Sequence, residues 1–434
     1  MSTADDSAAS LIDFALNFRL EMASPHALEW ARLIALDTFG AMLAARSHEI
    51  GRIACAHAAR HSTGTEAMIV ASGIRAGMLQ AAFANGVLAN AVDFDEGSHV
   101  ATVALPAALA VAERTGASGT DFLAAFIVAF ETCSRLREAL EPGSDGRGFW
   151  HIGFAGPLAA SLSAARLLRL DARTTRMALG LATASSGGLR RNLGTMAKAF
   201  HSGNAARAGI EAALLAADGF TSDADLLDAP MGFLASVCAP QEPLRDALLD
   251  LLKKPLTLDA PAKIKVMPIC TPIAPAVDVC IAMRAEHGFN VQDIAAVEAD
   301  LRRGSLIRDE PTDVDAAPFC GRFLIATALI KGRIALEDVD EAAITDAATL
   351  ALMQRVQDVP KQKSVRIRLN DGRVLEAALR PVQRLRTRDE VIAKFQHCAA
   401  TVWSAPMIAR FVDDMLTIED RPDLSGLFPQ PAAI

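Results

Sequence analysis

Apolar residues recur every three to four positions along most of the first 255 residues, which is the spacing of one helix face. Residues 25–37 show this pattern, and Thr120-Asp121 can cap a helix over 122–140. Further helices are expected over 158–170, 174–185, 205–218 and 244–253. The apolar positions are mostly small residues, which lets neighbouring helices approach closely. The pattern therefore predicts an all-helical domain.

The pattern changes near Pro255. Residues 295–302 are predicted to form a strand, and two alternating segments flank Asn370-Asp371-Gly372, which is a strong hairpin signal. Helices are expected between these strands over 273–287, 319–330 and 346–356, and again at the C-terminal end over 388–404 and 406–419.

These elements predict a mainly α protein with two domains. The first is a large all-helical domain over residues 1–256, against which the C-terminal helices of 386–434 pack back. The second is a smaller α+β domain over 257–385, whose sheet contains the antiparallel hairpin.

Composition narrows the function classes. The net charge of −8 argues against a nucleic-acid partner, which would need a basic patch. The 7 cysteines stand singly, with no C-x-x-C, so neither a disulfide framework nor a zinc site is expected. The first ten residues are polar and acidic, and the longest apolar runs are too short to cross a bilayer. A cytoplasmic enzyme without a membrane partner is expected.

The first candidate cluster follows the apolar run 78–92. Asp93, Asp95, Glu96 and His99 stand together where a helix is expected to end, although carboxylates there oppose the helix dipole. Asp93 and His99 are candidates for proton transfer in a pocket. Two alternatives remain open: an Asp-x-Asp-x₃-His group that holds Mg²⁺ or Mn²⁺, and a solvated acidic loop with a capping role.

Two further clusters precede expected helices. His151, next to Trp150, lies before a helix expected to start near Gly156, where backbone N–H groups favour anions. Thr195, Lys198 and His201 lie in a loop expected to enter the helix over 205–218. A desolvated lysine is suited to base or anion-binding work. The alternatives are a packed loop histidine and a lysine that reaches out to solvent.

The fourth cluster combines Lys263, Lys265 and Cys270 in a segment expected to be a strand that Pro268 ends. Lys265 and Cys270 are candidates for a cleft at the junction of the domains, where ligand sites commonly lie. The alternative is an edge strand with a solvated lysine and a buried, inert cysteine. Walker A, G-x-G-x-x-G and H-E-x-x-H motifs are absent from the sequence.

The order and spacing of these clusters resemble the MmgE/PrpD family, which includes 2-methylcitrate dehydratase, cis-aconitate decarboxylase and iminodisuccinate epimerase. The resemblance covers nearly the whole chain. The stretches that carry it are Ala91-Val-Asp93-Phe-Asp95-Glu96, His99 with Pro106-Ala-Ala-Leu-Ala, Trp150-His151, Gly194-Thr195-x-x-Lys198 with Gly203-Asn204, and Lys265-x-x-Pro268-x-Cys270. The sequence departs from the family pattern at Ile273-Ala274, where Thr-His is frequent, and at Phe323, where a tyrosine usually stands.

The resemblance implies a homodimer with an active site between the two domains and no metal or organic cofactor. It implies a small anionic polycarboxylate as substrate. The catalytic residues carried over by position are Asp93, His99, His151 and Lys198, and the substrate-binding residues are Lys265, Cys270, Thr195 and His201.

The expected reaction removes a proton next to a carboxylate. Lys198 and Lys265 are expected to neutralise carboxylate oxygens. A neutral His99 or His151, oriented by Asp93, is suited to the base and acid tasks, and His151 is the candidate acid that protonates a departing hydroxide. The first expectation is a hydro-lyase of the 2-methylcitrate dehydratase kind. An isomerase of the iminodisuccinate epimerase kind is the alternative, and a non-catalytic binding protein on the same scaffold is the third.

Overall fold

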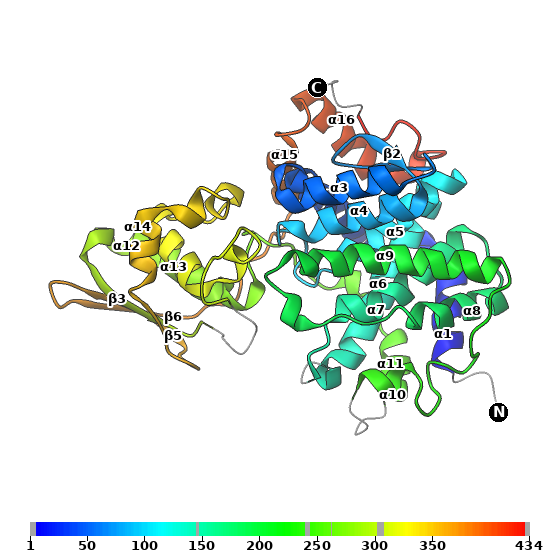
Figure 1. The fold of residues 1–434 in the computed structure, drawn as a ribbon, viewed down its shortest axis with the longest axis horizontal. Coiled ribbons are helices and arrows are strands. Elements are labelled where there is room, and N and C mark those ends of the chain that lie inside the picture. Colours follow the sequence, from blue (N-terminus) through cyan, green and yellow to red (C-terminus); the bar gives the residue numbers. More distant parts are fainter. Residues whose placement is uncertain (1–5, 145–146, 239–243, 262, 302–307, 430–434) are drawn as a thin grey trace.

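The chain folds into a large helical body and a smaller α+β domain (Figure 1). A computed structural model describes residues 6–144, 147–238, 244–261, 263–301 and 308–429. The helical body comprises α1 (Ser7–Asn17), α2 (Pro25–Ala44), α3 (Glu49–His61), α4 (Met78–Ala91), α5 (Ala101–Thr115), α6 (Gly119–Ser144), α7 (His151–Leu167), α8 (Ala172–Thr183), α9 (Met196–Ala217), α10 (Phe233–Val237) and α11 (Leu244–Leu252), with α15 (Arg388–Ala399) and α16 (Ala405–Leu416).

Helices α4 and α9 pack unusually closely. A Cβ atom at Gly86 in α4 would lie 2.7 Å from the Cα of Gly203 in α9, so only glycine fits at this contact. The same contact brings the C-terminal end of α4 beside the first turns of α9. Asn90 there donates a 2.6 Å hydrogen bond to Ser202 Oγ. The small residues of the sequence thus bring α9, which carries Lys198, close to the end of α4, which the loop with Asp93 follows.

The C-terminal helices pack on α2 at the top of the helical body (Figure 1). Phe39 of α2 meets Phe411 of α16 edge to face, with ring centroids 5.3 Å apart. Phe395 of α15 stacks on Phe411 at 5.5 Å. Such aromatic pairs contribute roughly 0.5–1.5 kcal/mol each beyond the area they bury.

The smaller domain is a four-stranded sheet covered on one face by helices (Figure 1). Its strand order is β4-β3-β5-β6; β3 and β4 are parallel and the other pairs antiparallel. Burial alternates along β5, as expected of a sheet with one solvated face. The elements are β3 (Ile294–Ala299), β4 (Val356–Asp358), β5 (Ser364–Leu369), β6 (Val374–Ala378), α12 (Ala274–His287), α13 (Gly321–Lys331) and α14 (Ala347–Met353).

The predicted fold class is confirmed, with four local corrections. The helical body also contains a short hairpin, β1 (Ala67–Ile69) with β2 (Ile74–Ala76). The helix expected over 346–356 ends at Met353, because Val356 enters β4 beside β3. In the segment 263–265, Ile264 and Lys265 form only isolated bridges, not a strand. The strand expected over 295–302 ends at Ala299, and its last residue lies outside the described residues.

A further correction concerns where two helices begin. Helix α9 begins at Met196, because the Thr195 side chain accepts a 3.2 Å hydrogen bond from the backbone N–H of Ala197. Lys198 and His201 therefore lie within a helix and not in a loop. Helix α7 begins at His151 itself, five residues before the expected Gly156.

None of the helices in the described part of the chain combines the length and the apolar character that crossing a bilayer requires.

Candidate functional site

The loop between α4 and α5 contains the candidate residues Asp93, Asp95, Glu96 and His99. Asp93 and His99 both have positive φ angles, 50° and 63°, in the left-handed region that residues other than glycine seldom adopt. Asp93, Asp95 and Glu96 are all buried. Glu96 accepts hydrogen bonds from the backbone N–H groups of Val100 and Ala101, at 2.6 and 3.4 Å, and so caps α5. The capping alternative is thus confirmed for Glu96, whereas the solvated acidic loop is wrong.

Asp93 holds the ammonium groups of two lysines that are far apart in the sequence. Its Oδ1 lies 2.7 Å from Lys198 Nζ, and its Oδ2 lies 2.8 Å from Lys265 Nζ. Lys265 also donates to the backbone oxygen of Asp93 at 2.9 Å. Burial alone would raise the pKa of Asp93, but the two ammonium groups and His99 outweigh it and hold that pKa well below its usual value. Both lysines are buried, so neither reaches out to solvent as the alternatives supposed.

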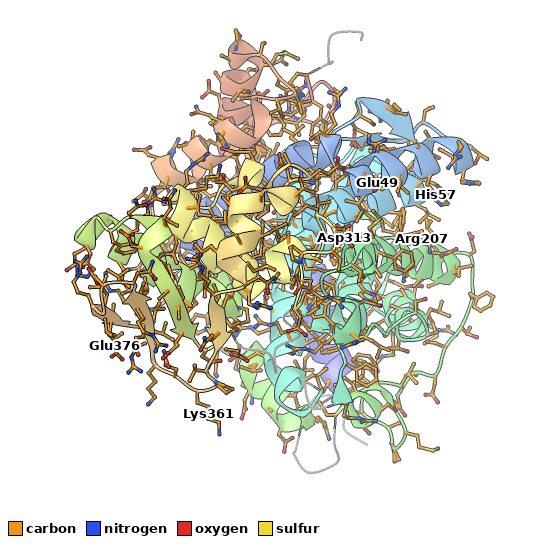
Figure 2. All side chains as sticks on the ribbon, turned by 60° about the vertical axis from the view of Figure 1, so that its left-hand side comes forward. Glu49, His57, Arg207, Asp313, Lys361 and Glu376 are labelled. Atoms are coloured by element: carbon orange, nitrogen blue, oxygen red, sulfur yellow. The ribbon has the colours of Figure 1, made fainter. Side chains whose placement is uncertain are left out.

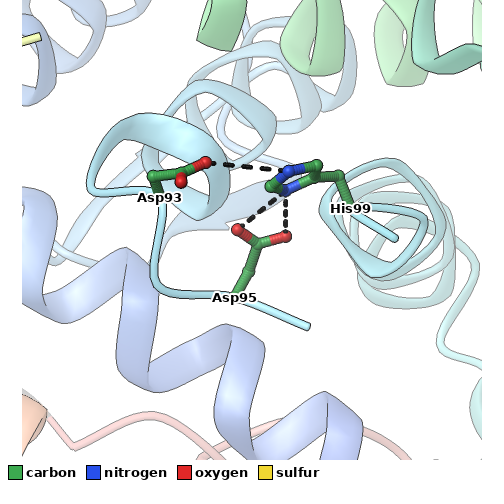
Figure 3. Close-up of side chains that lie close together, drawn as sticks. All are labelled: Asp93, Asp95 and His99. Atoms are coloured by element: carbon green, nitrogen blue, oxygen red, sulfur yellow. Dashed lines mark hydrogen bonds and ion pairs between the residues drawn. The ribbon is translucent and has the colours of Figure 1, made fainter. Parts of the chain in front are cut away.

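His99 is oriented by Asp95, and not by Asp93 as the sequence suggested (Figure 3). Its Nδ1 lies 2.8 and 3.0 Å from the two carboxylate oxygens of Asp95. An ionised carboxylate only accepts, so Nδ1 carries the proton and Nε2 keeps a lone pair. Nε2 faces Asp93 Oδ1 at 3.6 Å.

The imidazole of His99 stays neutral near neutral pH. Burial lowers its pKa most strongly, Asp95 raises it, and the ammonium groups of Lys198 and Lys265 lower it again, so that it lies below the ordinary 6.5. A neutral imidazole with a free ring nitrogen is suited to accept a proton.

The metal alternative can be tested against the same geometry. Ligand atoms of Asp93, Asp95 and His99 lie within 4.8 Å of one another, close enough to share an ion. Both oxygens of Asp93 already face an ammonium group, however. A divalent cation there would lie beside two buried positive charges, which repel it strongly at low dielectric. The donor set thus fits two lysines better than a metal.

Lys198 lies in an aromatic and amide environment. Its Nζ lies 5.8 Å from the ring of Trp150 and 5.7 Å from that of Phe319, within cation–π range. It also donates to the side-chain oxygen of Asn90. Sequence reasoning missed Asn90, although its place one helical turn before Asp93 was a usable signal.

A small cavity adjoins Lys198 where the helical body meets the smaller domain. Its volume of about 10 Å³ is room for roughly one water molecule. The smaller domain contributes Asp315, Pro318 and Phe319, none of which the sequence singled out. No motif marks Asp315, because its place in the site depends on packing between domains. The residues that line the cavity are Asn90, Ala91, Asp93, Thr195, Lys198, Ala199, Asp315, Pro318 and Phe319.

The remaining predicted residues surround this centre. His151 donates from Nε2 to the backbone oxygen of Ser98 at 2.7 Å, and this bond fixes its ring beside the loop that carries His99. His201 lies 5.6 Å from the ring of Trp150 and borders Asn192. Thr195 lines the cavity wall.

Cys270 matches the inert alternative. Its thiol is buried, and this burial raises its pKa to about 12, with Asp93 adding to the effect. Its nucleophilic thiolate is therefore scarce at neutral pH. At the two positions where the sequence departs from the family pattern, Ile273 and Phe323 are apolar and fully buried.

A much larger cavity lies elsewhere. It has about 1110 Å³ and lies between α2, α6 and residues 254–263. It touches the site loop only through Glu96 and Ser98, and none of the predicted site residues lines it. Of the predicted site residues, Asp93, Thr195 and Lys198 line the smaller cavity instead.

Comparison with known proteins identifies two matching family models. The MmgE/PrpD N-terminal domain matches residues 9–245, and the MmgE/PrpD C-terminal domain matches residues 267–415. The second range includes α15 and almost all of α16, which in space pack on the helical body.

Three similar proteins are named cis-aconitate decarboxylase or cis-aconitate decarboxylase-like protein. The chain is 32% identical to human cis-aconitate decarboxylase over 216 residues, which is 48% of this chain and 45% of the human protein. It is 26% identical to a cis-aconitate decarboxylase-like protein of Aspergillus oryzae over 411 residues, 81% of this chain and 82% of the fungal protein. Mouse cis-aconitate decarboxylase is 35% identical over 162 residues, 35% of this chain and 33% of the mouse protein. The matched stretch thus spans less than half of the human and mouse relatives.

Proposed function

The chain belongs to the MmgE/PrpD family, and we propose that it is a lyase that acts on a small polycarboxylate by moving a proton next to a carboxylate group. The observation that carries this proposal is the arrangement around Asp93. One buried carboxylate aligns two buried ammonium groups beside a neutral imidazole, at a cavity between the two parts of the molecule. The similarity to cis-aconitate decarboxylases favours decarboxylation of a cis-aconitate-like acid over dehydration.

The lysines supply charge stabilisation in this proposal. A carbanion beside a carboxylate survives only when cations neutralise the carboxylate oxygens. Each ammonium group has three N–H donors. Lys265 uses two on Asp93, and the contact of Lys198 with the Asn90 backbone oxygen is long at 3.4 Å. The remaining N–H donors bind the substrate carboxylates while Asp93 keeps both lysines charged.

His99 moves the proton. In a dehydration or an epimerisation its Nε2 lone pair accepts the proton from carbon, and Asp95 and Asp93 stabilise the imidazolium that results. In a decarboxylation the C–C bond to one carboxylate breaks as CO₂ leaves, and its electron pair moves into the neighbouring unsaturated carboxylate. The carbanion then takes a proton from Nε2 of the imidazolium form of His99, which has obtained that proton from water. His151 was expected to act as acid, but its Nε2 is committed to Ser98; in our proposal it holds the loop in place.

Product analysis tests the reaction. The protein is incubated in D₂O with cis-aconitate, 2-methylcitrate and iminodisuccinate, and the products are followed by NMR. We expect CO₂ loss from the first acid. Water loss from the second would identify a dehydratase, and deuterium exchange without a change in composition would identify an epimerase. Background turnover of all three acids would contradict a lyase and favour a binding protein.

A substitution links the reaction to the site. Lys198→Met is expected to reduce turnover about 100- to 1,000-fold, because one of the two charges that stabilise the carbanion is lost. Lys253→Met, on a lysine whose side chain is 75% exposed, is the matched control and should leave turnover unchanged. We also propose that the chain is a homodimer, which sedimentation equilibrium would measure.

A further inference from the structure

Asp315 is the acidic group that the smaller domain contributes to the cavity. It lies just before the 3₁₀ helix η10 (Ala317–Phe319), and Asn90, Asp93 and Lys198 form the wall on the side of the helical body. Figure 2 shows its neighbour Asp313 where the smaller domain meets the helical body, near Glu49 of α3.

The two neighbouring acids differ in what they contact. Asp313 Oδ1 accepts a 2.8 Å hydrogen bond from the backbone N–H of Ala316 and so stabilises the turn before η10. Asp315 is half-buried and has no hydrogen bond or ion pair within the described part of the chain, although it lies in the field of Lys198. Its carboxyl group therefore makes no hydrogen bond or ion pair that would stabilise the closed cavity.

The charges around the cavity decide the state of Asp315. Burial raises its pKa to about 6, Asp313 and Glu49 add to this effect, and Lys198 opposes it. With His99 neutral, the two negative charges of Asp93 and Asp95 equal the two positive charges of the lysines. A bound polycarboxylate adds further negative charges, and these raise the pKa of a neighbouring carboxyl group further.

We propose that Asp315 faces the substrate, takes up one proton when a polycarboxylate binds, and then donates a hydrogen bond from its neutral carboxyl group to a substrate oxygen. This inference rests on the proposed function, because it requires an anionic ligand in this cavity. Asp315 thereby offers a polar contact beside Pro318 and Phe319, the other two residues that the smaller domain contributes to the cavity.

Calorimetry with citrate, a tricarboxylate probe, tests the proton uptake. Binding to the full-length protein is titrated in buffers of different ionisation enthalpy between about pH 6 and 8, which yields the number of protons taken up. Asp315→Asn keeps a hydrogen-bond donor but cannot titrate. We expect the wild-type protein to take up close to one proton more than this variant above pH 6. The difference between the proteins cancels the protons that citrate itself exchanges.

The affinity provides a second readout. Above about pH 6 the affinity of the wild-type protein should fall up to tenfold per pH unit more steeply than that of Asp315→Asn. Asp313→Asn removes the same charge outside the cavity wall and is expected to keep the wild-type proton uptake. Equal uptake in the wild type and Asp315→Asn would overturn the inference while leaving the proposed function intact, as would loss of uptake in Asp313→Asn. Absence of citrate binding to all three proteins would overturn both.

Discussion

At the scale of single residues, the site depends on the carboxylate of Asp93, which pairs with two ammonium groups. A buried ammonium group without a partner would cost several kcal/mol in desolvation. Asp93 removes this cost for Lys198 and Lys265 together, and the positive φ of 50° at Asp93 is the strained backbone that aims its carboxylate at both. Burial lowers the pKa of His99 most strongly, and the same two ammonium groups lower it further.

The titration of His99 is the prediction at this scale. Its pKa lies below 6.5, so the unfolded chain binds this proton more readily, and the contribution of His99 to stability is lost as pH falls below 6.5 through the folded pKa. NMR titration of the imidazole should show a midpoint below 6.5. Lys198→Met removes a nearby positive charge and should move the midpoint upward.

Two outcomes would contradict this account of His99. One is an equal midpoint in the wild type and in Lys198→Met, and the other is a wild-type midpoint above 6.5. The signal of His26, exposed at the start of α2, is the internal control and is expected to be the same in both proteins.

At the scale of elements, the C-terminal helix α15 supports the site loop from behind. Lys394 Nζ lies 2.7 Å from Asp37 Oδ1 of α2, and it donates to the backbone oxygen of Phe94, between the two site carboxylates. Its Nζ also lies 3.9 Å from the ring centroid of Phe94. Because Lys394 and Asp37 are both buried, this ion pair ties three segments together where water cannot replace it.

Unfolding measurements on this ion pair should be asymmetric. Asp37→Leu leaves a buried ammonium group without a partner and should cost about 3–5 kcal/mol of unfolding free energy. Lys394→Met should cost less, because burial already raises the pKa of Asp37 to about 6 and the carboxyl group can take up a proton. The double variant Asp37→Leu with Lys394→Met should recover most of the loss.

The exposed pair of Arg333 and Glu337, 2.8 Å apart, provides the control for these urea titrations. Arg333→Ala should change stability by no more than about 1 kcal/mol. A cost of Asp37→Leu as small as this would mean that the buried pair does not anchor α15.

At the scale of the whole molecule, the site exists only where the two parts meet. Lys265 lies on the segment that leads into the smaller domain, and this segment bridges to Glu96 through Ile264 and to Arg384 on the returning chain. The cavity of about 10 Å³ has no room for a polycarboxylate. We therefore expect the smaller domain to move away from α9 when a polycarboxylate binds.

Arg308 of the smaller domain bridges this junction by hydrogen bonds, and we expect it to favour the closed arrangement. Its Nε lies 3.1 Å from the backbone oxygen of Leu193, which immediately precedes Gly194 and the start of α9. Hydrogen bonds to charged groups contribute roughly 1.5–3 kcal/mol. Arg308→Gln should thus raise the open population about tenfold or more. Amide hydrogen exchange in residues 190–198, followed by mass spectrometry, should become faster by the same factor.

A second arginine of the smaller domain provides the control. Arg373 is exposed in the hairpin and pairs with Asp371, so Arg373→Gln should not change exchange in residues 190–198. Unchanged exchange in Arg308→Gln would mean that other contacts close the junction.

The sequence by itself determined the elements and the kinds of chemical group. Helix periodicity gave the helical body because apolar faces must be buried wherever the chain folds, and Asn370-Asp371-Gly372 marked the hairpin because few residues tolerate its turn. The unusual residues Asp93, His99, Lys198 and Lys265 were visible because charged groups rarely stand among small apolar ones.

Only the tertiary structure decided which groups are partners. The sequence predicted that Asp93 pairs with His99. In the structure Asp93 pairs with the two lysines, and His99 is hydrogen-bonded to Asp95. Asn90 and Asp315 also line the cavity, although neither was predicted from the sequence. The physical reason is that periodicity encodes which face of an element is buried, whereas partners across elements depend on distances of a few ångströms. Those distances follow from how closely helices such as α4 and α9 pack, at contacts like that of Gly86 with Gly203.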